Sequence, residues 1–196
     1  MSRKSDREEA ANWARKLLAD DFVILDSETT GLGGDDQIVQ LAVIDKTGAP
    51  LLNTFIRPTR PIPAAARSIH GITSEMVADA PTFGDVFNAL LMAIGGKRCV
   101  IYNVDYDRRL LHQSEQLHKY ERDPAWTCME MDGWRHLALW ECAMHWYSQW
   151  AGDWSSYHGN YRWQSLPGGD HSALGDARAC LAVLKRMAET KIKEES

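Results

Sequence analysis

The 196 residues include 44% hydrophobic side chains, which is enough to bury a full core and suits one domain. The net charge of −5 argues against a protein that coats nucleic acid with a basic face, because neutralising phosphates requires clustered Lys and Arg. The four cysteines are scattered without a Cys-x-x-Cys pair, and neither a signal segment nor a membrane-length apolar run is present, so we expect a reducing, cytoplasmic setting without a membrane partner.

The first two elements are a helix and a strand that ends in acids. Residues 5–19 carry apolar side chains at helical spacing, which predicts that segment 1–19 packs as a helix on a single domain spanning 20–196. The apolar run 22–25 leads directly to Asp26 and Glu28. Side chains two apart in a strand share a face, so these carboxylates converge and repel unless a cation lies between them. The pair therefore predicts a divalent metal site.

Strand and helix patterns alternate through the middle of the chain. They predict strands over 37–45, 51–57 and 99–102, and helices over 82–95 and 108–116. Two acids begin the last of these helices. Asp107 precedes Leu110 and Leu111 by three and four residues and shares their helix face, whereas Asp105 can be explained as a helix N-cap. We therefore favour Asp107 as a third functional acid, with Asp105 as its rival.

Seven of the eight tryptophans fall within residues 126–163. The apolar spacing over 133–150 predicts a helix there. Exposed indoles stack on unpaired bases, so this stretch is a candidate channel for a single nucleic-acid strand. Packing in the core explains most of these side chains, and we expect only one or two tryptophans to face a ligand.

The closing segment combines a histidine and an acid with a small, apolar helix face. Residues 171–177 have the sequence His-Ser-Ala-Leu-Gly-Asp-Ala, and a helix continues to about Thr190. His171 and Asp176 are the polar interruptions in this pattern. They are candidates for chemistry together with the acids of the first strand.

Four segments together resemble a known family. They are residues 26–32 (Asp-Ser-Glu-Thr-Thr-Gly-Leu), residues 70–73 (His-Gly-Ile-Thr), Asn103 followed by Tyr106-Asp107, and residues 171–177. In type and order they are similar to the motifs of the DEDDh group of 3′→5′ exonucleases, which is DnaQ-like or RNase T-like. Tyr102 departs from the pattern, since a histidine is common before the asparagine. The resemblance implies an α/β, ribonuclease H-like fold with a central five-stranded mixed sheet flanked by helices.

The resemblance also implies a site. Two Mg²⁺ ions, replaceable by Mn²⁺, would be held by Asp26, Glu28, Asp107 and Asp176. His171 would accept the proton of the attacking water. The terminal nucleotide would be bound by a set of residues around the acids: Thr29, Thr30, Leu32, His70, Gly71, Ile72 and Asn103.

The expected substrate is the 3′ end of a single strand, with DNA favoured over RNA and nucleoside 5′-monophosphates as products. The alternatives are an RNase T-like or short-oligonucleotide exoribonuclease and a non-catalytic scaffold that binds nucleic-acid ends. The resemblance further suggests a homodimer or association with a larger nucleic-acid-processing complex, although the sequence carries no interface signature.

Overall fold

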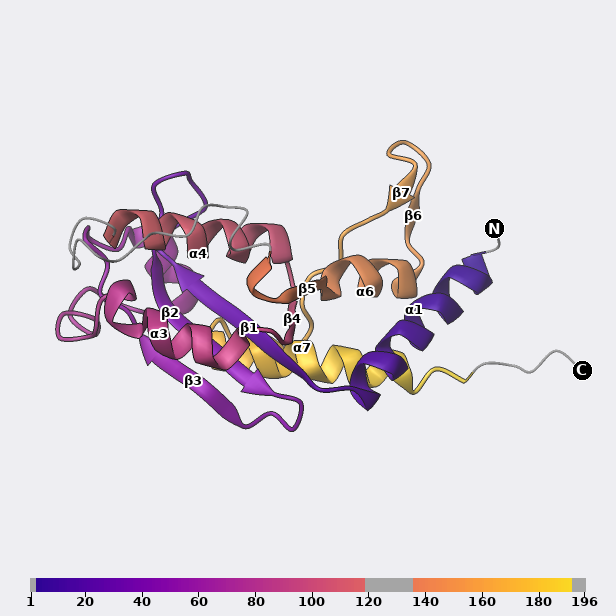
Figure 1. The fold of residues 1–196 in the computed structure, drawn as a ribbon. Helices are drawn as coiled ribbons and strands as arrows, with labels where there is room; N and C mark the ends of the chain where they lie inside the picture. Colours follow the sequence, from indigo (N-terminus) through magenta and orange to yellow (C-terminus); the bar gives the residue numbers. More distant parts are fainter. Residues whose placement is uncertain (1–2, 119–135, 192–196) are drawn as a thin grey trace, which may run out of the picture.

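The computed structural model describes residues 3–118 and 136–191. Its centre is a five-stranded sheet in the order β3-β2-β1-β4-β5 (Figure 1). The strands are β1 (Phe22–Thr29), β2 (Ile38–Asp45), β3 (Pro50–Phe55), β4 (Arg98–Ile101) and β5 (Leu139–Cys142). β2 runs antiparallel to β1 and to β3, whereas β4 runs parallel to β1 and to β5. The sheet is mixed, as predicted.

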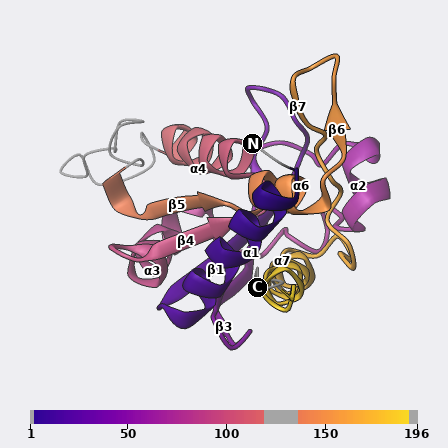
Figure 2. The same ribbon diagram turned by 90° about the vertical axis from the view of Figure 1, so that its right-hand side faces the viewer.

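Helices cover both faces of this sheet. They are α1 (Arg3–Ala19), α2 (Ala64–His70), α3 (Phe83–Ile94), α4 (Val104–His118), α6 (Ala143–Ala151) and α7 (Ala173–Ala188). α1, α6 and α7 share one core with Phe22 and Ile24 of β1, and α3 and α4 share a second core with Val23 and Leu25. Figure 2 shows α3 and α7 on opposite sides of the sheet. The alternation of side chains along β1 therefore assigns even-numbered residues to the α7 face and odd-numbered residues to the α4 face.

The predicted helix over 133–150 is confirmed from Ala143 onward and is wrong where the structure has β5. In the described part of that range, β5 occupies Leu139–Cys142 and α6 begins only at Ala143. β5 pairs in parallel with β4, with Arg98 opposite Leu139 and Ile101 opposite Cys142. Backbone pairing at the edge of the sheet outweighs the helical spacing of the apolar residues, which cannot by itself distinguish a short strand from a buried helix.

The tryptophans of the predicted channel divide between core and surface. Trp150 is buried and Trp140 and Trp146 are half-buried, whereas Trp154 and Trp163 are exposed. Trp126 and Trp134 lie outside the described residues. The two exposed indoles belong to a separate hairpin, formed by β6 (Trp154–Ser155) and β7 (Asn160–Tyr161), and to the segment directly after it. Among the described residues, no helix combines the length and apolar character that crossing a membrane requires.

Candidate active site

The end of β1 places two acids on the same face of the sheet. Asp26 and Glu28 are even-numbered residues, so they continue the face that Phe22 and Ile24 turn toward α7. Both carboxylates are half-buried, in contrast to the fully buried apolar residues before them. The buried apolar residues of β1 are thus followed directly by the half-buried acids of the site.

The N-terminal turn of α7 brings a third acid to this face. Ser172 caps α7, and its hydroxyl accepts a hydrogen bond from the Gly175 amide at 3.1 Å. The Oε1 atom of Gln40, which lies opposite Glu28 in the β1–β2 ladder, accepts from the Ala173 amide at 3.0 Å. These contacts position Asp176, so that one carboxylate oxygen from each of Asp26, Glu28 and Asp176 lies within 4.8 Å of the others.

The loop before α7 is folded around the Asp176 carboxylate. Its Oδ1 atom accepts from the amides of Asp170 and His171 at 2.9 and 3.2 Å. A Cβ atom at Gly169 would approach that oxygen to 2.7 Å, so the loop has no room there for a side chain. His171 itself has a φ of 58° and is exposed at the edge of the acids. The left-handed backbone conformation is uncommon for residues other than glycine, although histidine adopts it more often than most.

Asp107 is not part of the 4.8 Å group, but of the three neighbouring acids its charge raises the pKa of Asp26 the most. It is 5% exposed, and its carboxylate accepts a hydrogen bond from the Ser27 hydroxyl at 2.7 Å. Ser27 is the odd-numbered residue between the two β1 acids and turns toward α4. Asp105, its rival, is exposed and forms a 3.3 Å ion pair with Arg108. Because α4 begins at Val104, Asp105 lies in the first turn of the helix, and its explanation as an N-cap is wrong.

Burial and mutual repulsion raise the proton affinity of these acids. Burial raises the pKa of Asp26 well above its usual range, and the charges of Asp107, Asp176 and Glu28 add to the effect. Burial and then the charge of Asp176 raise the pKa of Glu28 to about 7. Burial likewise raises the pKa of Asp107 to about 7, although the Ser27 hydrogen bond opposes the shift. Clustered hard oxygen ligands of this kind fit a divalent cation, which would replace the protons that the acids otherwise retain.

The segment after α2 is fastened to the end of β1 by His70. The Nε2–H group of His70 donates to the Thr29 carbonyl at 3.1 Å, and Nδ1 accepts from the Ile72 amide at 3.0 Å. Both ring nitrogens are occupied in this neutral tautomer, and burial lowers the pKa of the ring. Gly71 ends α2 with a φ of 72°, and the Ile72 side chain packs in a small core with Val39. The Ile72 side chain is therefore not available to a nucleotide, whereas Gly71 is exposed and the His70 ring is half-buried.

A braced loop follows β1 and presents Leu32. The Tyr106 hydroxyl donates to the Gly31 carbonyl at 2.7 Å and lies 2.9 Å from the Thr29 hydroxyl. The Thr30 hydroxyl donates to Asp36 at 2.7 Å, which closes the loop from inside. Leu32 is 78% exposed on this loop, a placement compatible with the predicted contact to a terminal base. Asn103 is also exposed, one residue before α4.

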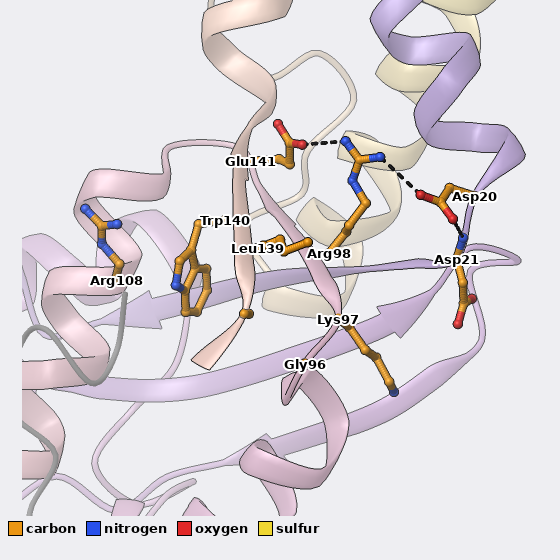
Figure 3. Close-up of a pocket in the computed structure, with 10 residues that line it drawn as sticks. Asp20, Asp21, Gly96, Lys97, Arg98, Arg108, Leu139, Trp140 and Glu141 are labelled. Atoms are coloured by element: carbon orange, nitrogen blue, oxygen red, sulfur yellow. Dashed lines mark hydrogen bonds and ion pairs between the residues drawn. The ribbon is translucent and has the colours of Figure 1, made fainter. Parts of the chain in front are cut away.

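A cavity of about 820 Å³ opens at the other end of the parallel strands (Figure 3). The Arg98 guanidinium lies in its wall between Asp20 and Glu141, at 3.1 and 2.6 Å. β1 begins at this end, whereas Asp26 and Glu28 lie near its other end. The cavity is therefore separate from the clustered acids, and its size is no guide to where the chemistry occurs.

The family of exonucleases described as RNase T matches residues 23–184, the span from β1 to α7 that contains all of these acids. The chain belongs to this RNase T, or DnaQ-like, exonuclease family.

Relatives extend the match over nearly the whole chain. The uncharacterized exonuclease CP81 of Escherichia phage 186 is 38% identical over 187 residues, which cover 90% of this chain and 92% of that protein. A solved structure of exonuclease X in complex with 5′ overhanging duplex DNA superimposes with a TM-score of 0.54 at 29% identity, covering 87% of this chain and 94% of that one. E. coli exonuclease I in complex with a dT13 oligonucleotide has a TM-score of 0.61 at 16% identity, covering 87% of this chain and 41% of that one, and shows the fold alone. The predicted ribonuclease H-like fold and exonuclease family are confirmed.

Three polar residues that position the acids of this exonuclease were not predicted. Ser27 holds Asp107, Gln40 holds the start of α7, and Asp170 accepts from the Ser172 amide and hydroxyl at 3.0 and 2.7 Å. Ser27 was recognisable in principle, because it alternates with the two acids in a strand. Gln40 was signalled only as a polar residue within an apolar run, and its partner is 133 residues away.

The pKa shifts predict that divalent cations stabilise this exonuclease more strongly at higher pH. The folded-state pKa of Glu28 is raised from 4.5 to about 7, so without metal the folded chain binds more protons than the unfolded one in that window, and stability falls as pH rises through it. A cation competes with those protons and restores the loss. Mg²⁺ or Mn²⁺ should raise the melting temperature over EDTA by roughly 3 to 6 °C at about pH 8 and much less at about pH 5.5. Equal shifts at both pH values, or an equal shift from Na⁺ at matched ionic strength, would contradict the assignment.

Proposed function

We propose that this exonuclease hydrolyses single-stranded nucleic acid, DNA in preference to RNA, from the 3′ end and releases nucleoside 5′-monophosphates. The observation that carries the proposal is the convergence of Asp26, Glu28 and Asp176 within 4.8 Å, on two elements that the family match spans. Acids packed so closely have no role in folding that an apolar cluster would not serve better. They are suited to holding cations.

Asp26, Glu28 and Asp176 would hold two Mg²⁺ ions, and Asp107, whose charge acts on both Asp26 and Glu28, would complete the set. When bound, such a pair lowers the pKa of an attacking water and neutralises charge on the leaving 3′-oxygen. His171 is exposed beside the acids, and the unprotonated nitrogen of its imidazole would accept the proton of that water. The hydrogen bonds from the Asp170 and His171 backbone amides to Asp176 hold the backbone of His171 next to that acid.

The braced loop that follows β1, and the hydrogen bonds of His70 to Thr29 and Ile72, support a preference for an unpaired 3′ end. Leu32 projects from a loop whose conformation is held by Tyr106 and Asp36, so it can press on a terminal base without yielding. The neutral His70 ring keeps the Gly71 backbone against the end of β1. A single strand would pass between these two features with its last nucleotide over the acids.

End-labelled substrates test direction and substrate class together. With a 5′-labelled DNA strand of about 20 nucleotides, we expect a descending ladder, and with a 3′-labelled strand, immediate release of a labelled mononucleotide. EDTA should abolish both. Matched RNA, blunt duplex and duplex with a 5′ overhang complete the comparison, since the overhang leaves a recessed 3′ end. Faster degradation of blunt duplex than of single strand would contradict the proposal, and a scaffold would cleave none of these substrates.

A further inference from the structure

The β6–β7 hairpin stands out from the body of the molecule. Figure 1 shows it projecting beyond α6, and Figure 2 shows it on the same side of the molecule as α2. Its strands are two residues each, joined by a turn over 156–159 in which Gly159 adopts a φ of 63°. A hairpin this short is not stable alone. It is fastened to the body by the Tyr161 hydroxyl, which donates to Asp6 of α1 at 2.6 Å.

The hairpin exposes aromatic side chains that lie outside the hydrophobic cores. Tyr157 is 90% exposed, Trp163 is 60% exposed and Trp154 is 38% exposed, and none of them belongs to the described cores. Trp154 contacts Tyr161 edge to face at 5.1 Å, which stiffens the base of the hairpin while the other two rings remain outside. Exposed aromatics gathered on one projection indicate a binding surface.

A recess of about 500 Å³ lies between the turn and Trp163. It is lined by Ser155, His158, Asn160, Tyr161, Arg162 and Trp163. Arg162 forms a 3.6 Å ion pair with Asp153 but remains 62% exposed, so its guanidinium is available to a second anion. An indole face beside an amide, an imidazole and a guanidinium matches the chemistry of a nucleobase next to its phosphate. A purely apolar protein partner would leave these polar groups unsatisfied.

The chain itself limits how far the recess lies from the acids. Gln164, next to Trp163, is held by the Ser148 and Tyr102 hydroxyls at 3.3 and 2.7 Å. Asp170, seven residues after Trp163, is bonded to Asp176. Seven residues span at most about 25 Å. A stacked strand advances about 3.4 Å per nucleotide, so a strand ending at the acids can reach the hairpin within about seven nucleotides.

We propose that the hairpin, residues 153–163, binds the single strand upstream of its 3′ end, with a base stacked on Trp163 and a phosphate facing Arg162. The inference rests on the proposed function, which places the 3′ end at Asp26 and Asp176. It assigns the hairpin a role in holding long substrates and none in the hydrolytic step. Trp163 is then the tryptophan that faces the ligand.

Substrate length separates this role from a structural one. In EDTA, where no cleavage interferes, we measure the binding of fluorescent oligothymidylates of about 20 and about 3 nucleotides by anisotropy. Trp163→Ala should weaken binding of the long strand by about five- to tenfold, the lower part of the range for one stacked base, and leave the short strand unchanged. Trp163→Phe should retain most of the affinity. The matched control is Met92→Ala, which removes an exposed apolar side chain from α3, away from the hairpin, and should bind like the wild type.

Unchanged affinity of Trp163→Ala for the long strand would overturn the inference, as would an equal loss on both lengths or a wild type that does not bind the long strand. The melting temperature of each variant is measured first, and because Trp163 lies outside the described cores it should stay close to that of the wild type. The proposed function fails separately. If the wild type cleaves no end while the length-dependent loss persists, the hairpin site stands without the exonuclease direction. If the wild type degrades from the 3′ end and Trp163→Ala binds normally, only the hairpin inference falls.

Discussion

Replacing Asp26 by asparagine should abolish turnover and at the same time stabilise the metal-free protein. Asparagine keeps the shape of the side chain but removes a charge that burial, Asp107, Asp176 and Glu28 all disfavour. Without that charge the cations lose a central ligand, and we expect kcat to fall at least about a thousandfold. In EDTA at about pH 8 the free energy of unfolding should rise, since the asparagine amide carries no charge for burial and the neighbouring acids to disfavour.

The pH dependence of this stabilisation checks its cause. The folded-state pKa of Asp26 is raised, so wild-type stability declines as pH rises above the unfolded value of 3.8, whereas asparagine does not titrate. The two proteins should therefore be similarly stable near pH 4 and diverge at higher pH. Asp105→Asn makes the same chemical change at an exposed acid on α4 and should alter neither activity nor stability. Destabilisation by Asp26→Asn, or activity close to wild type with Mn²⁺ supplied, would contradict the site.

The local signals of β1 and α7 were strong enough to predict the centre of this fold. An apolar run ending in Asp26 and Glu28 has the period of a strand, and a small, apolar helix face interrupted by Asp176 has the period of a helix. The register of β1 follows from the same alternation, because a shift by one residue would turn Ser27 toward α7 and both acids toward α4. The elements that carry these acids, and the faces on which the acids lie, were therefore predictable.

What the sequence did not predict depends on partners that are distant along the chain. β5 forms a strand because its backbone pairs with the edge of β4, and the ion pair between Arg98 and Glu141 links the two strands. Asp107 is fixed by Ser27, 80 residues earlier, and α7 begins where Gln40 accepts the Ala173 amide. Such contacts leave no periodic trace. The exposure of Trp163 has the same origin, since it depends on a hairpin held to α1 by Tyr161 and Asp6.

Replacing His171 by asparagine should remove most turnover while leaving the acids and the fold intact. The backbone of His171 is left-handed, with a φ of 58°. Asparagine cannot act as a general base, but it tolerates this backbone conformation better than most side chains do. The Asp176 contact is made by the His171 amide, so the substitution preserves it. Loss of a general base costs about a hundredfold to ten-thousandfold in kcat. The Michaelis constant and the melting-temperature shift produced by Mn²⁺ should stay near their wild-type values.

Alanine at the same position distinguishes the missing base from a disturbed loop. His171→Ala lacks the base as well, but it also lacks the short polar side chain by which asparagine supports a left-handed backbone. If the imidazole acts as the base, the asparagine and alanine variants should lose similar amounts of kcat, and only alanine should lower the melting temperature. If His171 serves mainly to shape the loop around Asp176, asparagine should retain activity that alanine loses, and the assignment of the base would be wrong. His145→Asn, at an exposed histidine of α6, is the control and should behave as wild type.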